Sequence, residues 1–209
     1  MIGTDAWRQH ARPTRIADDL VVVPAWLPFE QRHGETVIRI EPAAAFGLGD
    51  HPTTRLSAAA LQGAMHEFAV RRPERPPCVL DVGCGTGILS VIAARLGAAR
   101  VRAIDVSVDA LEASAANARA NNAHDIIEID DTPIAEIDEL FDAVVANILA
   151  PALVSMAADL QRLTSSDGLL IISGVLAGAY AHVVEALSPM VAIRTATLDG
   201  WAAVTFRHG

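Results

Sequence analysis

The amino-acid sequence predicts an α/β fold in which helices cover both faces of a doubly wound, mostly parallel sheet. Apolar runs alternate along the chain with helical patterns, which is typical of such folds. Residues 141–148 and 169–175 are almost continuously apolar, as strands buried on both faces are. A short apolar run that begins at Cys78 leads into Asp81 and then into Gly83, Gly85 and Gly87, and a glycine-rich turn between strand and helix is a common ligand site in this class of sheet.

The elements around the glycine loop follow the same alternation. A helix is predicted from Ile88 onward, because the glycine loop feeds an apolar and Ala-containing segment. Residues 100–105 predict the next strand, residues 109–122 an Ala-rich helix, and residues 126–129 a third strand. The strand at residues 141–148 is then the fourth of this series.

The last third of the chain predicts one more unit of the sheet and a terminal hairpin. Pro151 opens a helix at a position where its missing N–H is not needed. One face of that helix carries Leu153, Met156, Leu160 and Leu163. After the strand at 169–175, a helix is expected over 180–187. Residues 191–198 and 201–207 flank Asp199-Gly200, which is turn chemistry, so they are predicted to pair as a hairpin.

Composition narrows the class of protein without identifying it. The 209 residues, 52% hydrophobic and 20% charged, suffice for a single buried core. No apolar run is long enough to cross a bilayer and no signal pattern opens the chain, so a cytoplasmic protein without a membrane partner is expected. All 16 basic residues are arginine, and the net charge of -9 makes nucleic acid an unlikely partner. Cys78 and Cys84 are too few for a disulfide scaffold or a zinc centre, so we expect no metal.

Two classes of ligand compete for the glycine loop. A dinucleotide fingerprint requires a third glycine where this chain has Ile88. The glycines instead follow Asp81 in the pattern D-x-G-x-G-x-G, which resembles the first motif of S-adenosylmethionine (SAM) dependent methyltransferases. Asp105 ends the next apolar strand, at the distance where a carboxylate accepts both ribose hydroxyls. The alternative is a glycine-rich turn without a ligand.

Two flanking motifs make the resemblance more specific. One is the segment at residues 41–55, which contains Phe46-Gly47-Leu48-Gly49 and Asp50-His51-Pro52-Thr53-Thr54. The other is Asn147-Ile148-Leu149-Ala150 after the fourth strand. With them the chain resembles the bacterial methyltransferases of ribosomal protein L11, a SAM-dependent family that methylates lysine side chains and a terminal amine. The resemblance runs from about Trp7 to the last strand.

This resemblance implies a fold and a set of cofactor contacts. The fold is a doubly wound, seven-stranded, Rossmann-like class I SAM-dependent methyltransferase that ends in an antiparallel hairpin. The implied ligand is SAM, with S-adenosyl-L-homocysteine as product. The expected SAM-binding residues are Phe46, Thr54, Asp81, Gly83, Gly85, Gly87, Asp105, Asp131 and Asn147. Phe46 and its glycines are expected across the methionine end, and Asp131 near the adenine amine.

The chain departs from the family pattern in two places. Leu48 stands where the family has threonine, which removes a hydroxyl near the expected methyl-transfer site. The family binds its ribosomal substrate with a separate amino-terminal domain, and we expect no counterpart of that domain in this sequence. The cofactor and the chemistry therefore carry over more directly than the ribosomal substrate does.

The amino-terminal segment predicts structure of its own. Residues 21–23 and 37–40 read as short strands, with Pro24 and Gly34 between them as turn residues, and a disordered tail does not carry that apolar content. We expect residues 1–45 to form an extension that packs on the active site. Residues 46–209 are then the SAM-dependent methyltransferase domain.

Methyl transfer to an amine requires a neutral nucleophile in line with the methyl group. A free lysine has a pKa of about 10.4, so the amine must first lose a proton. The Asn147 side chain and the Ile148 carbonyl are expected to accept hydrogen bonds from the amine. The alternative is that Asn147 only caps the end of the strand and contacts the cofactor. His51 is a candidate proton acceptor because imidazole titrates near neutrality, or it simply braces its loop.

Three functions remain open at this point. The first is an N-methyltransferase that acts on a protein lysine or amino-terminal amine. The second is a small-molecule methyltransferase that uses the same catalytic domain. The third is a SAM-binding protein without turnover, which is disfavoured because the glycines, both carboxylates and Asn147 are all present.

Overall fold

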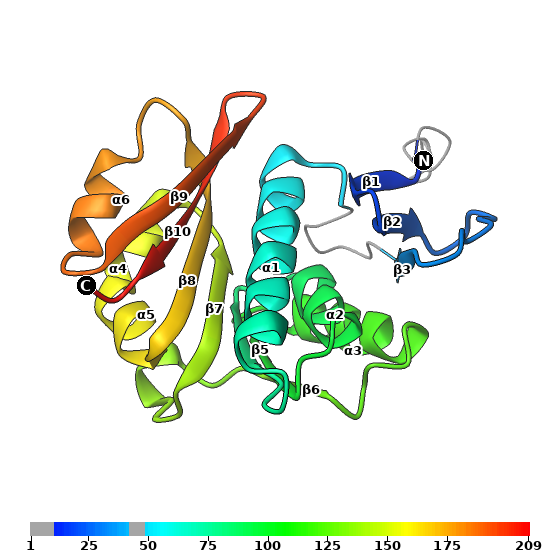
Figure 1. Cartoon of the computed structure of the whole chain (residues 1–209), viewed down its shortest axis with the longest axis horizontal. Helices are drawn as coiled ribbons and strands as arrows, with labels where there is room; N and C mark the ends of the chain where they lie inside the picture. The colour runs from blue at the N-terminus through cyan, green and yellow to red at the C-terminus, as the bar shows by residue number, and fades with distance from the viewer. Residues whose placement is uncertain (1–10, 42–48) are drawn as a thin grey trace.

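A computed structural model describes residues 11–41 and 49–209, and a seven-stranded sheet forms its centre (Figure 1). The strand order is β6-β5-β4-β7-β8-β10-β9. The first five strands of that order run parallel, and β10 runs antiparallel to both of its neighbours. The predicted fold class is confirmed. The strands are β4 (Cys78–Val82), β5 (Arg100–Ile104), β6 (Ile127–Asp130), β7 (Phe141–Asn147), β8 (Thr164–Leu176), β9 (Val191–Leu198) and β10 (Trp201–Arg207).

Helices cover both faces of this sheet (Figure 1). Residues of β4 alternate between the two layers: Val79 packs in the core with α1 and α2, and Leu80 packs in the core with α4 and α5. Burial on both faces is the reason that the strands read as continuous apolar runs. The first layer holds α1 (Pro52–Arg71), α2 (Ile88–Arg95) and α3 (Val108–Ala120), and the second holds α4 (Ala150–Ser155), α5 (Ala157–Leu163) and α6 (Ala181–Ala186).

The chain changes direction across the sheet at β4. From β4 it proceeds outward on one side through β5 and β6, and it then crosses to β7 on the other side. Adjacent loops therefore leave the carboxyl ends of β4 and β7 in opposite directions. A crevice forms at such a point in open α/β sheets, and ligands bind there.

The helix predicted from Pro151 is divided in two. Met156 ends α4 and precedes α5, and it has non-helical backbone angles that do not continue α4. The Ser155 hydroxyl donates a hydrogen bond to the Ala152 carbonyl at 2.9 Å, and the same carbonyl accepts from the Met156 backbone at 3.0 Å. Leu153 and Leu160 are fully buried as expected, whereas Met156 turns partly toward solvent.

The predicted hairpin is confirmed and carries an irregularity. Asp199 and Gly200 both have positive φ, the conformation of a tight two-residue turn. Residues Arg194 and Ala192 pair with successive residues of β10, so Ile193 is left without a partner and forms a bulge. Strand β9 is the outermost strand, and residues 191–197 are exposed.

A second, three-stranded sheet packs beside the first helix layer. It contains β1 (Thr14–Ala17), β2 (Leu20–Pro24) and β3 (Thr36–Ile40), with β2 antiparallel to β1 and parallel to β3. The strands predicted over 21–23 and 37–40 are thus confirmed. Their apolar side chains join the core of the first helix layer. The boundary proposed at residue 45 lies outside the described residues.

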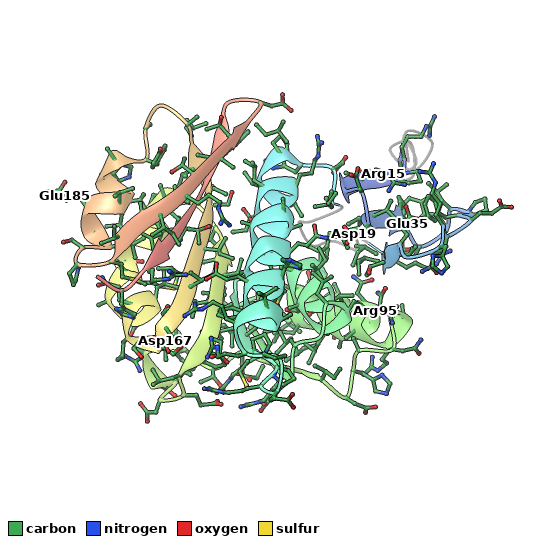
Figure 2. The ribbon with its side chains drawn as sticks, in the orientation of Figure 1. Arg15, Asp19, Glu35, Arg95, Asp167 and Glu185 are labelled. Atoms are coloured by element: carbon green, nitrogen blue, oxygen red, sulfur yellow. The ribbon has the colours of Figure 1, made fainter. Side chains whose placement is uncertain are left out.

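An ion pair fastens the loop of this small sheet. Arg15 lies 2.6 Å from the carboxylate of Glu35, whose side chain is 2% exposed (Figure 2). A hydrogen bond from the Arg32 backbone and the charge of Arg15 lower the pKa of Glu35 despite its burial. The turn before β3 therefore keeps a charged carboxylate as its anchor.

Among the described residues, no helix combines the length and the apolar character that a membrane crossing requires.

The buried carboxylate of Asp142 offers a test of the fold at the amino end of β7, away from the crevice. It accepts hydrogen bonds from Arg72 and from the Cys78 backbone, both at 2.9 Å, and thereby joins the end of α1 to β4 and β7. Asp142→Ala should lower the free energy of unfolding by about 3 kcal/mol, because it leaves both donors without an acceptor. Arg75→Ala is the control: Arg75 lies 3.6 Å from the same carboxylate but is 70% exposed, so less than about 1 kcal/mol is expected. Urea unfolding measures both values, and equal losses would contradict the assignment.

Candidate functional site

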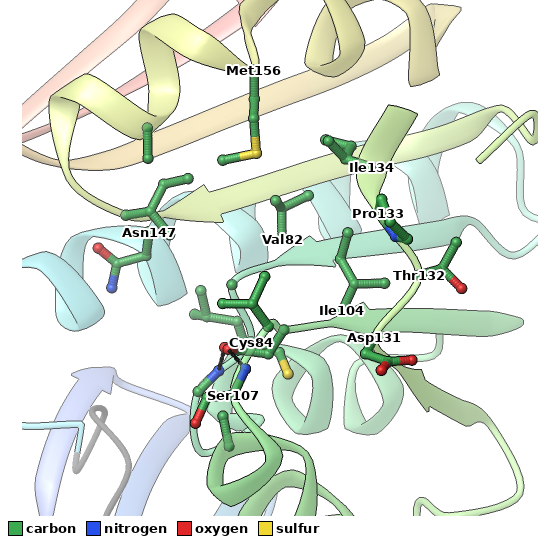
Figure 3. A pocket seen from close by; sticks show the side chains of 18 of the residues that line it. Val82, Cys84, Ile104, Ser107, Asp131, Thr132, Pro133, Ile134, Asn147 and Met156 are labelled. Carbon is green, nitrogen blue, oxygen red and sulfur yellow. Dashed lines mark hydrogen bonds between the residues drawn. The ribbon is translucent and has the colours of Figure 1, made fainter. Parts of the chain in front are cut away.

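A cavity of about 720 Å³ opens at the carboxyl ends of β4, β5 and β7. Its volume is within the range of roughly 300–1,000 Å³ that small-molecule sites occupy. Figure 3 shows Asn147 on one side of it, Thr132, Pro133 and Ile134 on the opposite side, and Met156 above. The predicted site residues that line it are Thr54, Gly83, Gly85, Asp105, Asp131 and Asn147.

The glycine loop between β4 and α2 approaches its neighbours too closely for side chains. Gly83 has a φ of 71°, and a Cβ there would lie 2.5 Å from the Ile148 side chain. Gly87 has a φ of 74°, and a Cβ there would lie 2.3 Å from the Ser114 hydroxyl oxygen. Glycine is the residue that tolerates both the left-handed backbone and the contact. The loop can therefore present its backbone to a ligand while it packs on β7 and α3.

Asp105 links the end of β5 to this loop. Its carboxylate accepts a hydrogen bond from the Gly85 backbone at 2.9 Å and another from the Ser107 backbone at 3.0 Å. The residue is partly exposed and faces the cavity, so its remaining lone pairs are available to a pair of ligand hydroxyls. This geometry agrees with the predicted ribose contact, which stays a prediction.

The cavity fits a cationic ligand better than a phosphate-bearing one. Asp105, Asp109 and Asp131 contribute carboxylates to its lining, and no arginine or histidine is among the described residues that line it. A pyrophosphate would meet uncompensated negative charge there, whereas a sulfonium with an α-amino group would be attracted.

Thr54 supplies a second indication of a ligand. It is 1% exposed, lies at the start of α1 and lines the cavity, yet its buried hydroxyl has no hydrogen-bond partner among residues 11–41 and 49–209. Buried polar groups are normally satisfied, and an exception in a cavity wall is explained by a ligand atom. The residues present therefore fit a bound SAM.

The cavity includes a wall that the sequence analysis did not identify, apart from Asp131. Thr132, Pro133 and Ile134 follow β6, and Ile134 begins the short 3-10 helix η2 (Ile134–Glu136). Arg102 of β5 holds this segment by donating a hydrogen bond to the Thr132 hydroxyl at 2.9 Å and by pairing with Asp130. Only their place after a strand distinguished these residues in the sequence.

Asn147 stands at the end of β7 with its side chain unengaged. No other described residue forms a hydrogen bond with its amide, and it lines the cavity across from the wall at 132–134 (Figure 3). The carbonyl of the next residue, Ile148, lies close to Gly174, where an added Cβ would be 2.2 Å away. The exit of β7 is thus packed against β8 and holds Asn147 in a defined place.

Asp81 lies behind the glycine loop rather than in the cavity wall. It is 1% exposed and accepts hydrogen bonds from the backbone and the hydroxyl of Ser90, at 3.0 and 2.6 Å. Burial raises the pKa of Asp81 to about 6, against the opposing effect of the Ser90 hydrogen bonds. Asp81 joins β4 to α2, and its direct contact with a ligand stays a prediction, as does that of Gly87.

Burial likewise raises the pKa of the Cys84 thiol. Cys84 is 6% exposed within the glycine loop, so it lines the cavity as a neutral thiol. A buried, neutral thiol is a poor nucleophile, so Cys84 acts as a small residue of the loop.

His51 caps the first helix of the domain. Its Nδ1 accepts a hydrogen bond from the Thr53 backbone at 3.3 Å, and its ring meets Trp201 edge-on with centroids 5.3 Å apart. It is not among the described residues that line the cavity, so its catalytic role stays a prediction beside a clear structural one. Phe46, predicted to cover the methionine end, lies outside the described residues.

Comparison with known proteins identifies the family. The family model of ribosomal protein L11 methyltransferases matches residues 4–209. The chain belongs to the ribosomal protein L11 methyltransferase family. The suspected resemblance is thereby confirmed, and with it the predictions of a methyltransferase class and of SAM as the family's cofactor.

Individual L11 methyltransferases match over most of this chain. The protein of that name from Geobacter sulfurreducens is 42% identical over 204 residues, which cover 97% of this chain and 64% of the relative. That from Geotalea daltonii is 39% identical over 186 residues, which cover 88% of this chain and 59% of the relative. The chain thus spans about three fifths of the length of these relatives.

Solved structures agree with the fold. The crystal structure of a ribosomal protein L11 methylase from Lactobacillus delbrueckii subsp. bulgaricus has a TM-score of 0.83 at 29% identity, covering 95% of this chain and 100% of that one. Magnesium protoporphyrin IX methyltransferase from Synechocystis PCC 6803, solved with bound SAM, has a TM-score of 0.58 at 17% identity, covering 75% of this chain and 82% of that one. The latter likeness shows the shared fold alone.

The raised pKa of Asp81 predicts a pH-dependent stability. The Asp81 carboxyl has a pKa of about 6 in the fold, above the ordinary aspartate value of 3.8, so the fold binds this proton more tightly than the unfolded chain does. The stabilisation from protonation is complete below about pH 3.8 and is lost as the pH rises past about 6. Asp81→Asn should therefore gain stability relative to the wild type between about pH 4 and pH 7, by on the order of 2 kcal/mol.

Urea unfolding at both pH values measures this difference. Ser90→Ala serves as a companion variant: it removes the hydroxyl that donates to the carboxylate and keeps the backbone donor, so the transition should move to higher pH. A difference between Asp81→Asn and wild type that does not change with pH would contradict the assignment.

The ribose contact of Asp105 predicts a loss of SAM affinity. Asp105→Ala removes the acceptor for ligand hydroxyls and for the Gly85 backbone, so the dissociation constant should rise by more than about tenfold. Asp109→Ala is the matched control, since this carboxylate lines the same cavity but is exposed on α3. Calorimetric titration with SAM compares the two, and an unchanged affinity for Asp105→Ala would rule out the ribose contact.

Proposed function

We propose that this chain transfers a methyl group from SAM to an amine, and that the acceptor is a lysine or amino-terminal amine of a protein. The arrangement that carries the proposal is the cavity between the glycine loop and Asn147. Thr54 lines it with a buried hydroxyl that no residue in the described part of the chain satisfies. The cytoplasm is part of the proposal, because ribosomal proteins are made there.

When bound, SAM supplies an electrophilic methyl group on a sulfonium. The chain's own residues position the reactants. In this proposal Asp105 and the loop around Gly83 and Gly85 hold the cofactor, and the Thr54 hydroxyl forms a hydrogen bond with the cofactor. The apolar residues Val82, Ile104 and Met156 exclude water from the same cavity.

Asn147 provides the acceptor side of the mechanism. Its amide is not engaged by other described residues, and its oxygen is an acceptor for an amine N–H. A neutral amine held by the Asn147 oxygen and the Ile148 carbonyl would keep its lone pair free for the methyl group. Alignment of this kind accounts for a large part of catalysis in a displacement on an activated carbon.

Label transfer from SAM tests the proposal. Methyl-labelled SAM and the chain are incubated together in two reactions. One contains purified ribosomal protein L11 as the acceptor, and the other contains a bacterial lysate. Label in a protein band that resists solvent extraction, and that digestion places on lysine or an amino terminus, supports a protein amine acceptor. Label that enters only extractable compounds favours the small-molecule alternative, and SAM binding without any transfer favours a binding protein.

Asn147→Ala should depress methyl transfer far more than SAM binding. Misplacement of a nucleophile by about 1 Å costs on the order of a hundredfold in rate, so a loss of that size is expected in single turnovers at saturating SAM. The SAM dissociation constant should change by less than about threefold, because one neutral hydrogen bond contributes little net free energy.

His51→Ala provides the comparison. If the imidazole accepts the amine proton, its smaller loss of rate is concentrated at low pH, where the amine is most fully protonated. If it only caps α1, the loss of rate follows the loss of stability at every pH.

Equal losses of affinity and rate for Asn147→Ala would assign that residue to the cofactor alone.

A further inference from the structure

The open edge of β3 pairs with two asparagine side chains instead of a fourth strand. The Asn121 amide accepts from the Arg39 backbone N–H at 2.8 Å and donates to the Arg39 carbonyl at 2.7 Å. The Asn117 amide does the same to Glu41, at 2.8 and 2.9 Å. A primary amide carries the same donor and acceptor as a peptide group, so the two side chains continue the hydrogen-bond ladder of the sheet.

The spacing of these residues explains why the match works. Four residues of an α-helix rise by about 6 Å, and two residues of a strand by about 6.6 Å. Asn117 and Asn121 are one helical turn apart, and Glu41 and Arg39 are two strand residues apart, in antiparallel order. Both asparagines are buried, with exposed fractions of 1% and 6%. The end of α3 therefore fastens the three-stranded sheet to the main domain.

Only one of the two asparagines also touches the glycine loop. The Asn117 amide donates its second hydrogen to the carbonyl of Thr86, which lies between Gly85 and Gly87, at 2.9 Å. The corresponding hydrogen of Asn121 goes to the Asn117 carbonyl within the same helix, at 2.8 Å. Ser114, one turn earlier on this face of α3, is the residue that a Cβ at Gly87 would strike. The loop thus rests on α3 at two successive turns.

We propose that Asn117 is a positioning residue that couples SAM binding to the docking of the three-stranded sheet, because one amide fixes Glu41 and Thr86 together. This rests on the proposed SAM site. A ligand that orders the backbone at Gly83 and Gly85 also orders Thr86, and through Asn117 it stabilises the end of β3. By linkage, a firmly docked β3 increases the affinity for SAM by the same factor.

Asn117→Ala and Asn121→Ala form a matched pair for the test. Each removes two hydrogen bonds to the β3 edge and one further bond, and the two variants differ in whether that third partner is the glycine loop. Both should lower the melting temperature to a similar extent. Asn117→Ala should in addition raise the SAM dissociation constant by about tenfold, and Asn121→Ala by less than about threefold. Calorimetry and thermal unfolding separate the two readouts.

Hydrogen exchange on the wild-type chain provides a test that needs no variant. SAM should slow exchange at residues 36–41, although none of these lines the cavity, as well as at residues 83–88. Asn117→Asp keeps the oxygen that accepts from the Glu41 backbone but can donate neither to Thr86 nor to the Glu41 carbonyl. In this variant SAM should still protect the loop and should no longer protect residues 36–41.

The possible outcomes are distinct. Equal changes of SAM affinity in the two alanine variants would overturn the coupling, and so would protection that is confined to the cavity in the wild type. If Asn117→Ala does not fold, the hydrogen-exchange result on the wild type decides. Failure of the wild-type chain to bind SAM would contradict the proposed function itself and not the coupling alone.

Discussion

The site depends on how closely the loop after β4 packs against the elements on both sides of it. Gly83 lies against Ile148 at the exit of β7, and Gly87 lies against Ser114 of α3. These contacts bring the loop, the acceptor-side residue Asn147 and the first helix layer to one place. The close packing also explains why small residues, and no large ones, occupy the loop.

Electrostatics complements this packing. Three carboxylates line the cavity, and no basic side chain is among the described residues that line it. The arginines that form ion pairs with acids lie outside this lining. Arg102 forms ion pairs with Asp130 and Glu139, and it also donates a hydrogen bond to Thr132 in the cavity wall. The protein therefore uses its ion pairs to shape the cavity and leaves negative charge facing the ligand. Such a field suits a cation.

The sequence predicted the fold and the centre of the site because both rest on local patterns. Continuous apolar strands, the glycine loop and Asp199-Gly200 each leave a signature within a few residues. The long helix α1 was not predicted, because its sides face the main sheet, α2 and β1, and so its apolar residues do not form a single stripe. The wall at residues 132–134 and the pairing of Asn117 with Glu41 were also missed, since they depend on partners far away in the chain.

The placement of individual side chains was harder to predict than their proximity to the site. Asp81 and His51 do not line the cavity, and their side chains engage Ser90 and Thr53. A motif locates a residue on a loop, but competition among nearby hydrogen-bond donors decides where its side chain turns.

The bulge at Ile193 has a consequence for how the protein behaves at high concentration. An exposed edge strand offers a row of peptide groups to any other extended chain, and an eight-residue apolar strand such as β9 would be a good template for growth of the sheet. The extra residue bends the strand and increases its twist, so the next chain cannot follow it in register. Arg194 adds a charge on the same strand. The β9 edge of the sheet thus carries protection against aggregation, and removing the bulge would put solubility at risk before it affected chemistry.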